Sequence, residues 1–171
     1  DNPSLFIDRH GYLVAFYSKH ATSEPIYMWK TKNAEDISEW QIGASLNLND
    51  SVAYAGLSNT YTYTNICQLS NENGKLFLFW RGADFKPNFS VSLDNGKTWG
   101  PGKILILPDS VYKDRRPYLK IASNSKDVIH LAFTDGHPNV EPTNSIYYAK
   151  YRQNAVYKAN GEKITSWSSL P

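Results

Sequence analysis

Side chains that can transfer protons or bind anions recur beside apolar segments of this 171-residue sequence. Histidine and tyrosine can act as general acids or bases, and arginine can hold a carboxylate through two parallel N–H donors. Some of these residues follow an apolar segment and others precede one: His20, Arg81, Asp135 and His137 follow, whereas Tyr61, Tyr63, Asp114, Arg115 and Arg116 precede. Their types predict acid–base chemistry on an anionic substrate, provided that the fold brings them to one face.

Each candidate also has a purely structural interpretation. His20 lies in the polar stretch YSKHATSEP, where a loop histidine without a role is equally expected. Tyr61 and Tyr63 alternate in NTYTYTN, so both are predicted to face one side of a strand, where one of them can serve as packing. Arg81 follows KLFLFW, the most apolar segment of the chain. Its guanidinium therefore needs an anionic partner, which is either a nearby structural aspartate or a substrate carboxylate.

Three stretches of the sequence resemble one another and set the expected fold. They are NPSLFIDRHGYLVAFYSKH, YTNICQLSNENGKLFLFWRG and RPYLKIASNSKDVIHLAFTDGH. Each contains a strand, a turn and a more apolar strand, followed by segments for a third and a fourth strand, at a spacing of roughly 50 to 60 residues. We therefore predict one all-β domain, a partial β-propeller of about three four-stranded blades at residues 1–59, 60–113 and 114–171. A self-contained β-sandwich is the alternative fold.

Two short segments carry local predictions. SVSLDNGKTW contains Asn95 and Gly96, and an Asn-Gly pair predicts a two-residue hairpin turn because both residues tolerate positive φ. Asp94 and Thr98 are expected to form hydrogen bonds across this turn, with Trp99 folded beneath it. NAEDISEW, residues 33–40, is the segment in which a helical turn is expected.

Strand direction predicts that the candidate residues share one rim. Neighbouring strands of a blade run antiparallel, so the end of the second strand lies at the same face as the start of the first. Residues that follow second strands, such as His20 and Arg81, should therefore meet residues that precede first strands, such as Tyr63. His10 and His130, within a turn and a strand, are expected to be structural.

Composition excludes several classes of partner. The net charge is only +2 and the basic residues are scattered, so we expect no nucleic-acid binding. No apolar run approaches the roughly 20 residues of a membrane span, so we expect no membrane association. The lone Cys67 is predicted to be a buried structural residue. With three blades we expect a piece of a larger propeller, whose open blade faces allow self-association.

The quoted segments also carry a family resemblance. SLDNGKTW resembles the Asp box of sialidases and other propellers. NPSLFIDRHGYLVAFYSKH, YTYTN with LFLFWRG, RPYLKIASNSKDVIHLAFTDGHP and NSIYYAKY with VYKANGEKI resemble the BNR-repeat family of seven-bladed propellers that includes ulvan lyases. The resemblance implies a secreted or periplasmic enzyme that cleaves a uronic-acid polysaccharide by β-elimination. The alternatives are a rhamnosidase-like or sialidase-like hydrolase and a non-catalytic carbohydrate-binding propeller.

The resemblance also assigns residues. The family centre has two histidines, a tyrosine and an arginine, which match His20, Tyr63 and Arg81, with the other histidine expected just before Asp1. The fragment itself is therefore expected to be inactive. Further expected contacts to an anionic polysaccharide come from Tyr61, Arg115, Arg116 and His137. No cofactor is expected, although a structural metal ion near His137 would be compatible with the pattern.

Overall fold

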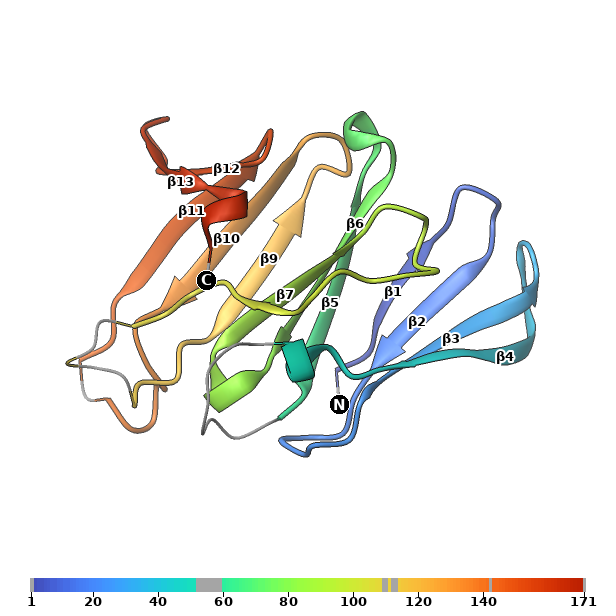
Figure 1. The fold of residues 1–171 in the computed structure, drawn as a ribbon, viewed down its shortest axis with the longest axis horizontal. Coiled ribbons are helices and arrows are strands. Elements are labelled where there is room, and N and C mark those ends of the chain that lie inside the picture. Colours follow the sequence, from blue (N-terminus) through green and yellow to red (C-terminus); the bar gives the residue numbers. More distant parts are fainter. Residues whose placement is uncertain (1, 52–59, 109–110, 112–113, 142, 171) are drawn as a thin grey trace.

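The computed structural model describes residues 2–51, 60–108, 111, 114–141 and 143–170, and these form three antiparallel sheets that follow one another in chain order (Figure 1). The first sheet contains β1 (Ser4–Ile7), β2 (Leu13–Tyr17), β3 (Ile26–Asn33) and β4 (Asp36–Leu46). The second contains β5 (Thr62–Leu69), β6 (Lys75–Arg81), β7 (Pro87–Ser92) and β8 (Lys103–Ile104). The third contains β9 (Leu119–Ser123), β10 (Val128–Thr134), β11 (Ile146–Arg152), β12 (Ala155–Tyr157) and β13 (Lys163–Ser166).

Each sheet is a meander in which consecutive strands pair, as expected for the blades of a β-propeller. The described helices are single 3₁₀ turns: η1 (Leu48–Ser51), η2 (Ser70–Glu72), η3 (Ala83–Phe85) and η5 (Trp167–Ser169). The third sheet has five strands, because β12 is short and turns back into β13. The first strands of the sheets are neighbours, since β5 packs against β1 on one side and against β9 on the other.

The central strand β6 holds the three sheets together. Its alternating side chains enter two different clusters, with Leu78 and Trp80 facing the first sheet and Phe77 and Phe79 facing the third. The part of a strand that is buried on both faces must be apolar, which explains the unbroken run LFLFW at residues 76–80. Arg81 is the last residue of this strand, so its backbone is fixed by packing on both sides.

Two segments differ from the sequence-based expectation. The helical turn predicted at residues 33–40 is wrong: β3 and β4 form a hairpin there, with Asn33 paired to Asp36. Glu35 adopts a φ of 56° in the turn, and its N–H donates to the carbonyl of Gly11 at 2.9 Å. Strand pairing and this contact outweigh the modest helix preference of Ala34 and Glu35.

The Asn95–Gly96 turn is real but is not a two-residue hairpin. Both residues have positive φ, 61° and 85°, yet they lie inside a longer loop between β7 and β8. Within that loop the Asp94 carboxylate accepts hydrogen bonds from the N–H of Thr98 at 2.9 Å and from its hydroxyl at 2.5 Å. Trp99 packs edge-on against Phe16 of the first sheet, with ring centroids 5.8 Å apart, so the loop closes the boundary between two sheets.

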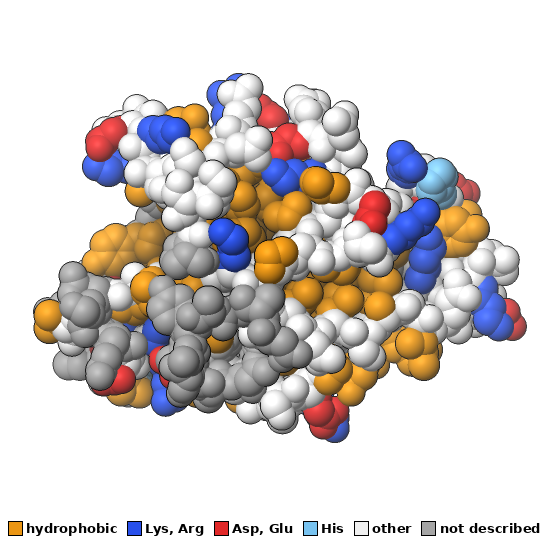
Figure 2. Space-filling view, in the orientation of Figure 1, with side chains coloured by type: hydrophobic (Ala, Val, Ile, Leu, Met, Phe, Trp, Pro, Cys, Tyr) orange, Lys and Arg blue, Asp and Glu red, His pale blue; other side chains and the backbone are white. Residues whose placement is uncertain are grey.

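The first and third sheets expose apolar side chains. Leu5 and Ile7 of β1 are 57% and 67% exposed, and Ile146 of β11 is 81% exposed. Figure 2 shows hydrophobic side chains reaching the surface in several places. Among the described residues, no helix is long and apolar enough to span a membrane.

Candidate functional site

A row of aromatic rings crosses the three sheets at the end where β6 finishes. His20, after β2, meets Tyr63 edge-on with ring centroids 5.5 Å apart. Tyr63 lies 6.0 Å from Tyr118, which precedes β9, and Tyr118 meets His137 edge-on at 5.3 Å. Each sheet therefore contributes to one continuous set of groups that can donate or accept protons.

The position of Tyr63 depends on a β-bulge in β5. Thr62 pairs with Arg81 and Asn65 pairs with Phe79, so one extra residue is accommodated between them. Tyr63 adopts a φ of 57°, a left-handed conformation that an aromatic residue rarely takes. Bulges commonly re-aim a side chain beside a functional site, and here the bulge turns Tyr63 toward Tyr118.

Arg81 is the buried cation of the site, only 8% exposed. Its Nε donates to the carbonyl of Phe85 at 3.2 Å, and its Nη1 donates to the hydroxyl of Tyr118 at 3.4 Å. The guanidinium also stacks over the Tyr118 ring, with Cζ 4.5 Å from the centroid. Among the described residues no carboxylate pairs with Arg81, because Asp84 bonds Lys86 and Asp135 bonds Arg115.

A tight turn behind Arg81 fixes its orientation. Asp84 and Phe85 in this turn have φ values of 49° and 57°, so two consecutive non-glycine residues are left-handed. The turn is closed by Gly82 N–H donating to the carbonyl of Lys86 at 2.8 Å. Lys86, 2% exposed, donates in turn to the carbonyl of Arg115 at 2.6 Å and so links the turn to the segment that leads into β9. Strained backbone of this kind persists where the surrounding structure enforces it, and it is concentrated at functional sites.

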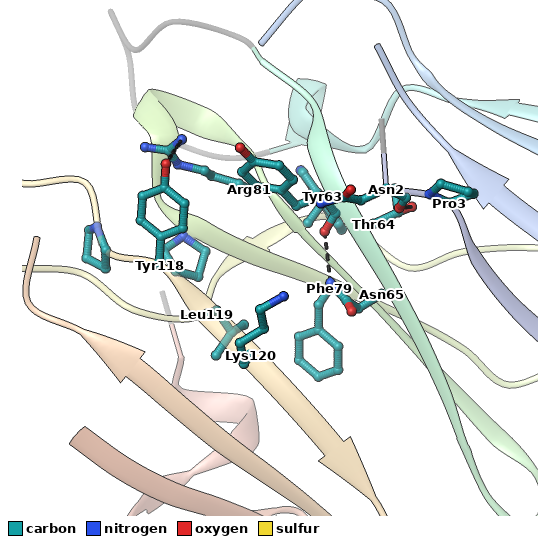
Figure 3. Close-up of a pocket in the computed structure, with 13 residues that line it drawn as sticks. Asn2, Pro3, Tyr63, Thr64, Asn65, Phe79, Arg81, Tyr118, Leu119 and Lys120 are labelled. Carbon is teal, nitrogen blue, oxygen red and sulfur yellow. Dashed lines mark hydrogen bonds between the residues drawn. The ribbon is translucent and has the colours of Figure 1, made fainter. Parts of the chain in front are cut away.

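Tyr63, Arg81 and Tyr118 line a cavity of about 600 Å³ between the second and third sheets. Figure 3 shows the guanidinium of Arg81 and the hydroxyl ends of Tyr63 and Tyr118 on the same side of this cavity. Its wall is completed by Asn2, Pro3, Thr64, Asn65, Phe79, Trp80, Pro87, Pro117, Leu119 and Lys120. Cations, amides and hydroxyls are present in the described wall and carboxylates are not, which suits an anionic, hydroxyl-bearing ligand.

Burial changes the ionisation of two of these groups. Burial, the charge of a neighbouring Tyr118 phenolate and the hydrogen bond to Tyr118 raise the pKa of Tyr63, and the positive charge of Arg81 opposes this increase. The Tyr63 hydroxyl therefore keeps its proton at neutral pH. Burial lowers the pKa of Arg81 from its usual value, since a charged guanidinium loses hydration there. An arginine nevertheless stays charged at neutral pH.

The remaining predicted contacts lie elsewhere. Tyr61 is 1% exposed in the core, where its hydroxyl accepts the N–H of Asn49 at 2.7 Å, so it does not line the cavity. Arg115 pairs with Asp135 at 3.1 Å and lines a separate cavity of about 470 Å³. Arg116 is exposed and stacks on Phe85 with Cζ 4.3 Å from the ring centroid, which keeps it near the site but outside the cavity wall.

Two residues of the site were missed in the sequence. Tyr118 is the residue that connects Tyr63, Arg81 and His137, and Lys120 adds a second cation to the cavity wall. The sequence does contain a signal for Tyr118: RRPYLK stands at the start of the third repeat, where YTYTN stands at the start of the second. Superposing the repeats would have placed Tyr118 beside Tyr63 at the start of a first strand.

No metal centre is assembled by the described residues, in which no group of three or more His, Cys, Asp or Glu side chains is placed to hold an ion. That includes the surroundings of His137, whose Nδ1 accepts the N–H of Asn139 at 3.1 Å. A sialidase-like hydrolase, one of the alternatives above, would need a tyrosine–glutamate pair near its arginines, and the described residues place no such pair beside Arg81. Glu72 does accept a hydrogen bond from Tyr151 at 2.7 Å, but it lies in the turn between β5 and β6, at the end opposite Arg81.

Comparison with known proteins supports the fold. An ulvan lyase of a new polysaccharide lyase family, solved with -[GlcA(1-4)Rha3S]-, has a TM-score of 0.68 and 20% identity, over 95% of this chain and 41% of that one. The Penicillium chrysogenum α-L-arabinanase complexed with arabinobiose has a TM-score of 0.57 and 14% identity, over 89% and 46%. The Podospora anserina α-L-arabinofuranosidase in complex with cellotriose has a TM-score of 0.54 and 12% identity, over 88% and 45%.

These similarities concern architecture, and the chain spans less than half of each of these enzymes. No curated protein matches the sequence. The model of a family described as BNR repeat-containing matches residues 1–171, the whole of the chain. The sequence repeats, the three antiparallel sheets and the match agree, and the chain belongs to the BNR repeat-containing family.

Proposed function

We propose that this chain carries the lyase site of a protein that cleaves a uronic-acid polysaccharide by β-elimination. Arg81 binds and neutralises the uronate carboxylate, and Tyr63 and His20 transfer the protons. The ulvan lyase of similar fold, solved with a uronate-containing saccharide, supports this substrate class. Because such a polymer cannot cross a membrane intact, the proposal includes a secreted or periplasmic location.

The observation that carries the proposal is the buried Arg81 without a carboxylate partner among the described residues. Removing a cation from water is costly unless an anion compensates. Here the backbone and two aromatic rings hold the guanidinium in place, and its charge is directed to the 600 Å³ cavity. A substrate carboxylate is the partner that this arrangement lacks.

Neutralising the carboxylate makes the neighbouring C5 proton acidic enough to remove. His20 takes this proton, and the C5–H electron pair forms the C4–C5 double bond as the C4–oxygen bond breaks. Tyr63 donates its proton to the departing glycosidic oxygen, which suits a phenol whose pKa is raised. Tyr118 contacts both Arg81 and Tyr63 and so fixes their positions relative to each other. Proton and electron counts balance without a cofactor.

A hydrolase is less compatible with the cavity. Most glycoside hydrolases require two carboxyl groups that flank the scissile bond, and the described wall of the cavity contains none. The similarity to the α-L-arabinanase and the α-L-arabinofuranosidase concerns the fold alone, at 14% and 12% sequence identity. A binding-only propeller would use the same cavity without chemistry, so the assay must distinguish all three.

The test uses the full-length protein on a polysaccharide of glucuronate and sulfated rhamnose. A lyase produces an unsaturated uronate that absorbs in the ultraviolet, a hydrolase produces reducing ends without this absorbance, and a binding protein produces neither. We expect Arg81→Ala to lower turnover by about 10²- to 10³-fold, as for loss of one preorganised charge-stabilising donor. Tyr63→Phe should also lower turnover, with thermal unfolding unchanged.

Arg152→Ala is the matched control, because Arg152 is exposed on β11 and pairs with Asp127 at 3.2 Å, away from the cavity. Its turnover should equal that of the wild type. If Arg81→Ala lowered the melting temperature and activity together, Arg81 would be a structural residue. Reducing ends without ultraviolet absorbance would replace the lyase by a hydrolase.

A further inference from the structure

A second cavity of about 630 Å³ lies at the opposite end of the sheets from Arg81. It is formed by the turn between β1 and β2, the turn between β5 and β6, and the loop between β7 and β8. Its lining combines cations, amides and apolar side chains: Arg9, His10, Met28, Lys30, Gly43, Ala44, Gln68, Asn73, Gly74, Leu93, Asp94, Asn95, Gly96 and Lys97. From this mixture we propose that the cavity is a second binding site for an anionic saccharide.

The cations at this cavity exceed the anions available to neutralise them. Lys30 pairs with the buried Asp8 at 2.8 Å. Arg9 and Lys97 form no ion pair with another described residue, although both are exposed. In Figure 2, Lys and Arg side chains gather around a histidine over the end of the molecule where β1 and β2 are joined.

Asp94 is the one acidic side chain among the described residues of the lining, and it already forms hydrogen bonds within its own loop. Asp94 accepts hydrogen bonds from the Thr98 hydroxyl and N–H and from the Ser92 hydroxyl. These bonds lower its pKa to about 2, so it is ionised and internally bonded. Arg9 and Lys97 therefore leave an excess of positive charge for a sulfate or carboxylate.

Amide side chains in the lining suit a hydroxyl-bearing ligand, because an amide both donates and accepts hydrogen bonds. Asn73 is exposed, and Gln68 Nε2 donates to the carbonyl of Gly74 at 3.0 Å, which orients the Gln68 amide. Met28 and Leu93 offer apolar surface to the C–H face of a sugar ring.

Occupation of this cavity is independent of the lyase proposal, because the two cavities lie at opposite ends of the sheets. The test measures retention of the full-length protein in gels that contain a sulfated uronate polysaccharide. All variants carry Arg81→Ala, which removes the main anion contact of the first cavity. Arg9→Gln with Lys97→Gln removes the two cations, and Lys126→Gln with Lys163→Gln, both exposed elsewhere, removes the same net charge.

We expect the first pair to weaken binding about 5- to 30-fold, as for loss of two exposed charge contacts, and the control pair to leave it unchanged. In the protein with Arg81 restored, the first pair should leave turnover of short oligosaccharides unchanged. Equal weakening by both pairs would mean that only net charge matters and would overturn the site. Equal displacement by inorganic sulfate and by a sulfated disaccharide at the same concentration would overturn its assignment to a saccharide.

Discussion

Replacing Lys86 with methionine tests whether a buried ammonium positions the candidate lyase site. Lys86 lies in the turn behind Arg81, and its Nζ is 2.6 Å from the carbonyl oxygen of Arg115 and 3.1 Å from Asp84 Oδ2. Arg115 is three residues before Tyr118 in the chain, and Tyr118 contacts Arg81. Lys86 therefore links the two sheets that supply the cavity wall.

The two contacts differ in their expected contribution to stability. The Arg115 carbonyl receives a charge-assisted hydrogen bond from a side chain that is 3% exposed, and losing such a bond costs about 1.5–3 kcal/mol. Asp84 has a side chain that is 34% exposed, so water can replace its partner and the ion pair contributes at most about 1 kcal/mol. Methionine is easier to bury than an ammonium group, which offsets part of the loss.

We expect Lys86→Met to lower the free energy of unfolding by about 1–3 kcal/mol. For a chain of this size the melting temperature should fall by roughly 3–10 °C. Turnover should fall by up to about 10²-fold, because a displacement of about 1 Å can cost that much. Circular dichroism during heating measures the first effect, and the ultraviolet assay on the full-length protein measures the second.

Asp84→Asn is the matched control for this variant. It removes the exposed ion pair and retains the bond from Lys86 to the Arg115 carbonyl, so stability should change by less than about 1 kcal/mol. Equal losses from the two variants would refute the argument, because the exposed contact would then carry the effect. Wild-type stability in Lys86→Met would refute it as well.

Three further outcomes are expected. Burial alone would raise the pKa of Asp8, but hydrogen bonds from Lys30 and two backbone N–H groups lower it overall. Asp8 therefore contributes stability above its unfolded pKa of about 3.8 that is lost as the pH falls through the lower folded pKa. The free energies of urea unfolding of wild type and Asp8→Asn should approach each other as the pH falls below that folded pKa, and a difference that stayed constant with pH would contradict this. Burial raises the pKa of Cys67 to about 12, so iodoacetamide at pH 8 should label it only after denaturation, and rapid native labelling would contradict this. The isolated chain should associate with increasing concentration through Leu5 and Ile7, and light scattering that shows a monomer throughout would contradict it.

The three-sheet fold could be predicted because its main signals are local. LFLFW, residues 76–80, is apolar at every position since β6 is buried on both faces, and a polar turn precedes the second strand in each of the three repeats. Residues 33–40 were mispredicted for the opposite reason. The conformation of Glu35 is set partly by its hydrogen bond to Gly11, which is 24 residues away in the sequence and so cannot be predicted from the neighbouring residues.

The candidate site was predictable only in part. Strand direction placed the start of β5 beside the end of β6, and Thr62 does pair with Arg81. Alternation along the strand then predicted that Tyr61 and Tyr63 face one side, but the bulge separates them and leaves Tyr61 in the core. A glycine or asparagine at position 63 would have indicated a bulge with left-handed φ, but the residue there is a tyrosine.

Some of the residues whose backbone conformation local sequence does not predict lie beside Arg81. Tyr63, Asp84 and Phe85 all have positive φ without being glycine, and each such residue costs on the order of 1–3 kcal/mol. Asp84 and Phe85 lie in the turn that follows β6, whose five apolar side chains are buried on both faces of the strand, and each side chain contributes roughly 1.5–3 kcal/mol. Burial of that strand can offset the strain. The packing that makes KLFLFW recognisable in the sequence is thus what allows a desolvated arginine and a strained turn to exist at its end.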